Sequence, residues 1–185
     1  MKFIILLSLS SILLSEEKYK EPQFILLDRE DNIEIREYGN YIVAKTSIPL
    51  ESAKSENNMF RVLASYIFGD NQKNKKIPMT APVTTFENNN SYEMIFYMLE
   101  SENIEDLPLP NAQDIIFETI SLGKCAVISF SWFVNNNRIN KYQKKLEQFL
   151  ESNGYKARSQ FMVNRYDPPW RLPFMRRNEV LVKID

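Results

Sequence analysis

The stretch from Phe60 to Thr84 constrains the fold more than any other part of the chain. One face of its helical first half carries apolar residues at i, i+3, i+4 and i+7: Phe60, Leu63, Ala64 and Ile67. A second apolar stripe runs beside the first: Met59, Val62 and Tyr66. Gly69 ends the helical pattern, and a basic loop then leads through Pro78 and Pro82 into a strand. A helix with two apolar stripes covers a core and also contacts something else, protein or ligand.

The rest of the chain shows the same order of patterns twice. The first half predicts strands at 33–38 and 41–48 around a turn at Gly39-Asn40, a helix at 50–68, and strands at 78–87 and 92–99. The second half predicts strands at 114–122 and 124–134 around a turn at Gly123, a helix at 135–152 ended by Gly154, and strands at 158–166 and 179–184. Each half therefore consists of a hairpin, a helix and two strands.

This order predicts an α+β fold. We expect eight strands that form a sheet closed or nearly closed on itself, with two helices packed outside. The strand at 92–99 is apolar on both of its faces. Such a strand has the barrel interior on one side and a covering element on the other.

The first fifteen residues stand apart from this domain. Lys2 precedes an apolar run to Leu14, and Glu16-Glu17 follow, which is typical of a secretory signal peptide. We therefore predict a signal peptide at 1–15, a domain at 16–185, and a secreted or periplasmic protein without a stable membrane anchor after cleavage. A retained anchor is the main alternative. Without the signal peptide 22 basic residues face 24 acidic ones, which argues against nucleic acid as a partner.

Composition removes most enzyme classes. The chain has no histidine and one cysteine, so it assembles neither a Ser/His/Asp site nor a Cys/His site, and no zinc site of nitrogen and sulfur ligands. Its four glycines form no phosphate-binding loop. Cys125 lies in an apolar strand and is expected to be a small core residue. Asn89-Asn90-Ser91 is a glycosylation sequon, relevant only in a eukaryotic host. We expect neither an enzyme nor a metal site.

Three segments resemble the SOUL, or haem-binding protein, family: FRVLASYIFGDNQKNKKIPMTAPVT at 60–84, LPLPN at 107–111 and YDPPWRLPFMRRNEVLV at 166–182. The resemblance implies a distorted eight-stranded barrel with two flanking helices. It also implies that haem or another tetrapyrrole binds in a shallow apolar cleft next to the first helix. Many relatives have Phe-Ser-Gly where this chain has Phe130-Ser131-Trp132, so the end of that strand is altered. The absence of histidine excludes a histidine axial ligand.

A tetrapyrrole needs an apolar slot, cations for its propionates and, optionally, an axial ligand. Four residues of the first helix are candidates for the slot, with packing on the barrel as the alternative role: Met59, Val62, Leu63 and Tyr66. The candidate propionate partners are arginines, which bind carboxylates in a forked geometry: Arg61, Arg176 and Arg177. Arg177 has the alternative role of anchoring the last strand. Met59 and then Tyr66 are the candidate axial ligands, and Trp170 is a candidate cap for a cleft.

The leading hypothesis is therefore a secreted or periplasmic protein that binds haem or another tetrapyrrole as a carrier, buffer or scavenger. The alternative is an interaction module of the same fold, which binds a protein or peptide and has no cofactor. An enzyme that acts through tyrosine or glutamate is a third possibility with little support in the sequence.

Overall fold

The structure is a computed structural model that describes residues 19–51 and 56–185. The predicted signal peptide lies outside these residues, as does part of the predicted start of the first helix. Seven strands, two α-helices and two short 3₁₀-helices follow one another along the described chain: β1 (Phe24–Glu30), β2 (Ile33–Pro49), α1 (Glu56–Ile67), β3 (Val83–Asn88), β4 (Ser91–Tyr97), η2 (Ile104–Asp106), β5 (Ile116–Phe130), α2 (Asn136–Asn153), β6 (Met162–Arg165), η3 (Pro173–Met175) and β7 (Asn178–Lys183).

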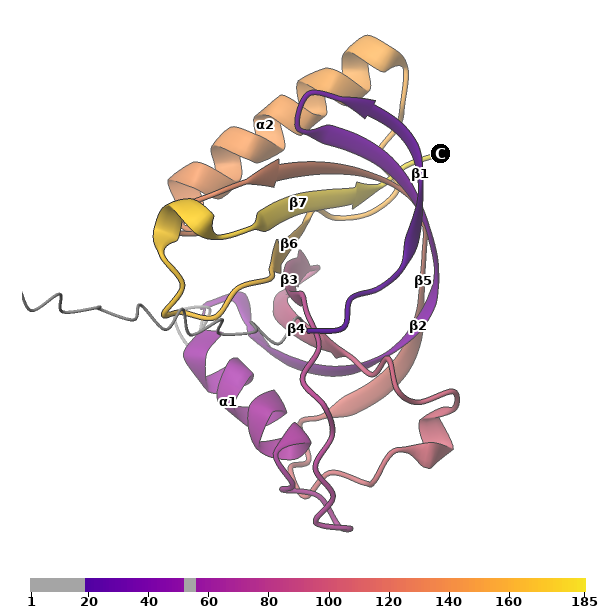
Figure 1. Cartoon of the computed structure of the whole chain (residues 1–185), viewed down its shortest axis with the longest axis vertical. Coiled ribbons are helices and arrows are strands. Elements are labelled where there is room, and N and C mark those ends of the chain that lie inside the picture. The colour runs from indigo at the N-terminus through magenta and orange to yellow at the C-terminus, as the bar shows by residue number, and fades with distance from the viewer. Residues whose placement is uncertain (1–18, 52–55) are drawn as a thin grey trace, which may run out of the picture.

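Six of these strands form a closed antiparallel barrel. The strands neighbour one another in the order β2-β4-β3-β6-β7-β5, and β5 closes the barrel by pairing with β2. β1 lies outside this ring and pairs with the first half of β2. The two helices lie outside the barrel, near opposite ends of the molecule (Figure 1). The predicted α+β barrel with two flanking helices is therefore confirmed. The described residues contain seven strands, six in the barrel and β1 outside it, where the sequence predicted eight.

The hairpins predicted around Gly39-Asn40 and around Gly123 are wrong. Each of these regions forms one long, bent strand. β2 continues through Gly39-Asn40, and β5 continues through Gly123. The strands pair with each other across this point, with Tyr38 opposite Gly123 and Asn40 opposite Ser121. Gly123 has a φ of 61°, a left-handed conformation that suits glycine. The glycines therefore allow two paired strands to bend together, where the sequence suggested that each strand reversed.

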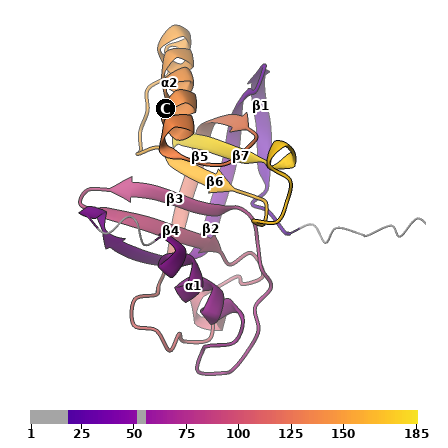
Figure 2. The same ribbon diagram turned by 90° about the vertical axis from the view of Figure 1, so that its left-hand side faces the viewer.

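Three apolar clusters hold the barrel and its helices together. One fills the barrel interior and includes Ile95 and Tyr97 of β4. The neighbouring residues Met94 and Phe96 point to the other side, into the cluster beneath α1. The third cluster lies between α2 and the barrel, and Figure 2 shows α2 and α1 at opposite ends. The prediction that β4 is apolar on both faces is confirmed.

The ends of α2 follow the expected capping chemistry. The Asn135 side chain accepts a hydrogen bond from the backbone N–H of Arg138 at 2.9 Å, which satisfies a free donor of the first turn. Gly154 ends the helix with a φ of 74°. In the described part of the chain, no helix combines the length and apolar character needed to span a membrane.

Candidate functional site

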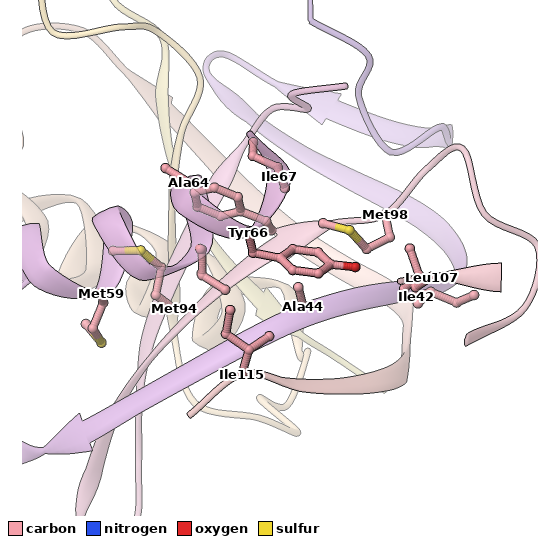
Figure 3. Close-up of a cluster of buried hydrophobic side chains, with 12 residues drawn as sticks. Ile42, Ala44, Met59, Ala64, Tyr66, Ile67, Met94, Met98, Leu107 and Ile115 are labelled. Atoms are coloured by element: carbon pink, nitrogen blue, oxygen red, sulfur yellow. The ribbon is translucent and has the colours of Figure 1, made fainter. Parts of the chain in front are cut away.

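The predicted slot residues of α1 lie together beneath the helix, in the core. Met59 and Leu63 are 2% and 0% exposed, and Tyr66 is also buried. Figure 3 shows Met59 and Tyr66 among the side chains of this cluster. The Tyr66 hydroxyl donates a hydrogen bond to the carbonyl of Pro108 at 2.9 Å. Val62 is half-buried at the edge of the same cluster. As placed, Met59, Leu63 and Tyr66 offer no surface to a ligand unless α1 moves away from the barrel.

The outward surface of α1 carries other residues. Phe60, which the sequence placed on the main apolar face, is 42% exposed, and its ring centroid lies 5.5 Å from that of Phe96. Phe68 is also exposed, just after the helix. Arg61 points to solvent and hydrogen-bonds the side chain of Asn58. The buried face of α1 therefore takes residues from both apolar stripes of the sequence and is centred between them.

The other predicted arginines belong to the segment that joins β6 to β7. Arg176 donates hydrogen bonds to the carbonyls of Pro169 and Arg171, and its guanidinium lies 4.9 Å from the ring centroid of Phe133. Arg177 pairs with Glu21 near the N-terminus of the described chain. The partners of Arg176 and Arg177 are therefore the 169–171 turn, Phe133 and the N-terminal segment. None of these partners is on α1.

Arg177 lines a pocket of about 540 Å³ at this end of the barrel. The N-terminal segment supplies Tyr19 and Glu21, the turn before β3 supplies Ala81, and the segment between β6 and β7 supplies the rest. From that last segment, aromatic, cationic and thioether side chains reach the pocket: Tyr166, Trp170, Arg171, Met175 and Arg177. Three segments that are far apart in sequence therefore build one cavity.

Backbone hydrogen bonds hold these walls in place. The Ala81 N–H donates to the carbonyl of Lys20 at 2.9 Å, which fixes the N-terminal segment against the barrel. The Tyr166 N–H donates to the carbonyl of Arg177 at 3.3 Å, so the pairing of β6 with β7 continues into the pocket. The Asp167 carboxylate accepts from the Arg177 N–H, and it pairs with the Nε of Arg171 at 3.1 Å. These hydrogen bonds and the ion pair fix the walls of the pocket relative to one another.

A column of polar groups connects the pocket to the barrel interior. The Arg177 guanidinium lies 3.5 Å from the ring centroid of Tyr166, whose hydroxyl donates to Glu179 at 2.6 Å. Glu179 in turn binds the buried Arg36 guanidinium at 3.0 Å. Burial, and then the negative charge of Glu179, raise the pKa of Tyr166 well above its ordinary value. Tyr166 therefore stays protonated and acts as a fixed donor in the pocket wall.

The chemistry of the pocket suits a flat apolar molecule that carries acidic groups. Trp170 is 79% exposed and presents an aromatic face, and Met175 offers a thioether. The ion pair between Arg177 and Glu21 is partly exposed, and such pairs contribute only about 0–1 kcal/mol, so an incoming carboxylate can compete for the guanidinium. The described residues contain no cluster of three acidic or cysteine side chains suited to a metal ion.

The sequence identified only part of this site. It named Arg177 as a propionate partner and Trp170 as a possible cap of a cleft, and both line the pocket. It gave no role to Tyr166, Arg171 or Met175. The tryptophan and methionine among the prolines and arginines of 166–177 were the available indication, since these two large apolar side chains are usually buried.

Comparisons with known proteins give a consistent picture. The profile of the family described as SOUL heme-binding protein matches residues 19–183. Heme-binding protein 2 of Mus musculus is 29% identical over 155 residues, which cover 80% of this chain and 75% of that protein. The solved C-terminal domain of EcmrR has a TM-score of 0.61 at 14% identity, over 83% of this chain and 96% of that chain. A hydrolase from Listeria innocua has a TM-score of 0.55 at 8% identity, over 86% and 94% of the two chains. At such identities these two structures support the fold alone.

Proposed function

The chain belongs to the SOUL heme-binding protein family, and from that premise we propose that it binds haem or another tetrapyrrole without catalysing a reaction. Family membership is the observation that carries this proposal. The name of the mouse relative, heme-binding protein 2, agrees with it. The protein acts as a carrier, buffer or scavenger, and the signal-peptide pattern at 1–15 supports a secreted or periplasmic location.

The pocket at the β6–β7 segment is the proposed site. Trp170 stacks on one face of the macrocycle, and Arg177 and Arg171 bind its acidic arms. The expected slot beneath α1 has weaker support, because its side chains already fill the core. The outward face of α1, with Phe60 and Arg61, is the second place where a macrocycle finds apolar surface beside a cation.

The absence of histidine sets the strength of binding. Met175 is the residue of the pocket whose thioether would bind the haem iron, as methionine does in some haem proteins. Without ligation, burial of about 200 Å² of macrocycle at ~25 cal/mol/Å² contributes roughly 5 kcal/mol before association costs. Apolar burial of this size alone therefore supports a dissociation constant no tighter than roughly 0.2 mM.

Hemin titration followed by Soret absorbance tests the proposal. The full chain is compared with two variants that each remove two exposed apolar side chains. One is Trp170→Ala/Met175→Ala in the pocket, and the other is Phe60→Ala/Phe68→Ala on α1 and the residue after it. Circular dichroism confirms that both variants are folded.

We expect saturable one-to-one binding by the natural chain, at least tenfold weaker binding by the pocket variant, and little change in the α1 variant. If the α1 variant alone loses binding, the macrocycle lies on the outward face of that helix. A response that does not saturate in the natural chain refutes tetrapyrrole binding. That result makes the interaction module the leading function.

A further inference from the structure

Six large apolar side chains are exposed on two loops at one end of the barrel. One loop follows β5 and the other contains η3, and both lie beside the start of α2 (Figure 1). The exposed fractions of these side chains range from 50% to 79%: Trp132, Phe133, Trp170, Leu172, Phe174 and Met175. We call these six residues the aromatic end. Soluble proteins rarely expose so many large apolar side chains on contacting loops unless the surface binds something.

The two loops form one rigid unit. The Trp132 N–H donates to the carbonyl of Pro173 at 2.8 Å, and the Asn178 side-chain amide donates to the carbonyl of Trp132 at 2.9 Å. Trp132 has a φ of 80°, a left-handed conformation that costs a bulky side chain free energy. An aromatic residue held outward at a position that suits glycine points to a role for its side chain.

Basic residues surround this surface. Arg171, Arg176 and Arg177 lie in the η3 loop, and Arg138 and Lys141 lie in the first turns of α2. Asp167 and Glu21 pair with Arg171 and Arg177, and Asp31 lies in the β1–β2 turn, whose Asn32 hydrogen-bonds Ser129 just before the loop after β5; these carboxylates are fewer than the five cations. This end of the molecule is therefore positive, although the whole chain carries a formal net charge of −1. Tryptophan and phenylalanine flanked by arginine and lysine match the chemistry of the membrane interface, where rings enter the headgroup region and cations bind anionic lipids.

The position of the N-terminal segment gives independent support. Tyr19, the first described residue, lines the pocket together with Trp170. The apolar sequence from Phe3 to Leu14 therefore joins the fold on the same side as the aromatic end. Where such a segment is retained as an anchor, the alternative to a cleaved signal peptide, it holds this side of the domain toward the bilayer.

We propose that the aromatic end is a peripheral docking surface for membranes rich in anionic phospholipid. Its aromatic and aliphatic side chains insert among the headgroups, and the arginines and lysine bind lipid phosphate. This function goes beyond tetrapyrrole binding, because Trp132, Phe133, Leu172 and Phe174 do not line the pocket, whereas Trp170 and Met175 belong to both surfaces.

The chain itself supplies the probe for a test. Its two tryptophans, Trp132 and Trp170, both belong to the aromatic end. Tryptophan emission of the full chain is recorded with vesicles of phosphatidylcholine alone and with vesicles that contain phosphatidylserine. The test variant described next keeps residues 3–14, so attachment through that segment alone would leave the binding of the variant unchanged. The test variant is Leu172→Ser/Phe174→Ser, and the control is Phe68→Ser, which removes an equally exposed ring near α1.

We expect a blue shift of the emission with anionic vesicles, quenching by brominated lipid, and weaker binding in high salt. The Leu172→Ser/Phe174→Ser variant binds at least about tenfold more weakly, with unchanged hemin binding, and Phe68→Ser behaves as the natural chain. An emission spectrum that does not change with anionic vesicles refutes the proposal. Equal binding to neutral and anionic vesicles also refutes the proposal, as does an unchanged affinity of the test variant. A protein partner then becomes the candidate occupant of this surface.

Discussion

Replacement of Leu63 by alanine separates a core role of α1 from a ligand-binding role. Leu63 is fully buried in the cluster between α1 and the barrel. If it is a core residue, Leu63→Ala destabilises the fold and leaves the hemin affinity of the folded protein unchanged. If it lines a ligand slot, the same change weakens hemin binding.

The structure sets the size of the effect. Removal of three carbon atoms from a fully buried leucine costs their transfer free energy and leaves a cavity, together about 2–5 kcal/mol. The neighbours Ala44 and Phe96 belong to strands that pair on both sides, so the site cannot easily collapse. We expect a loss of about 3 kcal/mol. For a domain of this size that corresponds to a midpoint lower by roughly 6–12 °C.

Urea denaturation and hemin titration are measured on the same preparation. Phe60→Ala is the control, because Phe60 lies on the same helix but is 42% exposed, and its loss should cost about 1 kcal/mol. The reasoning is refuted if Leu63→Ala lowers hemin affinity tenfold while the free energy of unfolding changes by less than about 1 kcal/mol.

Three further predictions concern the barrel. Glu179→Gln leaves the buried Arg36 guanidinium with Glu34 as its remaining carboxylate partner, so urea denaturation should show a loss of about 2 kcal/mol; a loss below about 1 kcal/mol would show that the pair of Arg36 with Glu179 is not needed. Gly123→Ala places a β-carbon at a φ of 61° and should cost about 1 kcal/mol by the same assay, whereas Gly39→Ala should change stability by less than half as much; equal effects would contradict the bend described for β5. Burial raises the pKa of the Cys125 thiol to about 12, so the native protein should not react with a thiol reagent at pH 8, whereas the protein in urea should react at once; rapid labelling of the native protein would show that this strand opens.

Local patterns predicted the elements whose boundaries depend on neighbouring residues. α2 begins after Asn135 and ends before Gly154, because a capping side chain and a left-handed glycine act within one turn of the helix. The strand β4 is apolar on both faces, as its composition requires. The order of the patterns predicted a closed sheet with two helices outside it, and the resemblance to a known family implied the same barrel.

The errors concern features that distant residues decide. Gly39 and Gly123 permit either a reversal or a bend, and the pairing of β2 with β5 across more than eighty residues selects the bend. The orientation of α1 depends on Ala44 and Phe96, so the sequence of the helix alone could not show that Phe60 faces outward. β1 was not predicted, because its four consecutive apolar residues lack the alternation typical of a half-buried strand.

The same limit applies to the candidate site. Its walls come from Glu21, Ala81 and the segment 166–177, and no local pattern brings these together. Arg177 was identified because arginine binds carboxylates in a forked geometry, and Trp170 because a tryptophan in the turn after Pro168-Pro169 can cap a cleft. The sequence alone does not indicate a role for Met175, which is seen to line the pocket only in the folded structure.

The order of strands in the barrel also affects how two copies of the chain can combine. The first half contributes β2, β4 and β3, the second contributes β6, β7 and β5, and only the pairings of β2 with β5 and β3 with β6 join them. A single connection, residues 98–115, links the halves. Two chains that exchange their second halves form the β2–β5 and β3–β6 pairings again, between chains, without any new contact. Refolding at high protein concentration therefore favours an exchanged dimer, and refolding at high dilution favours the monomer.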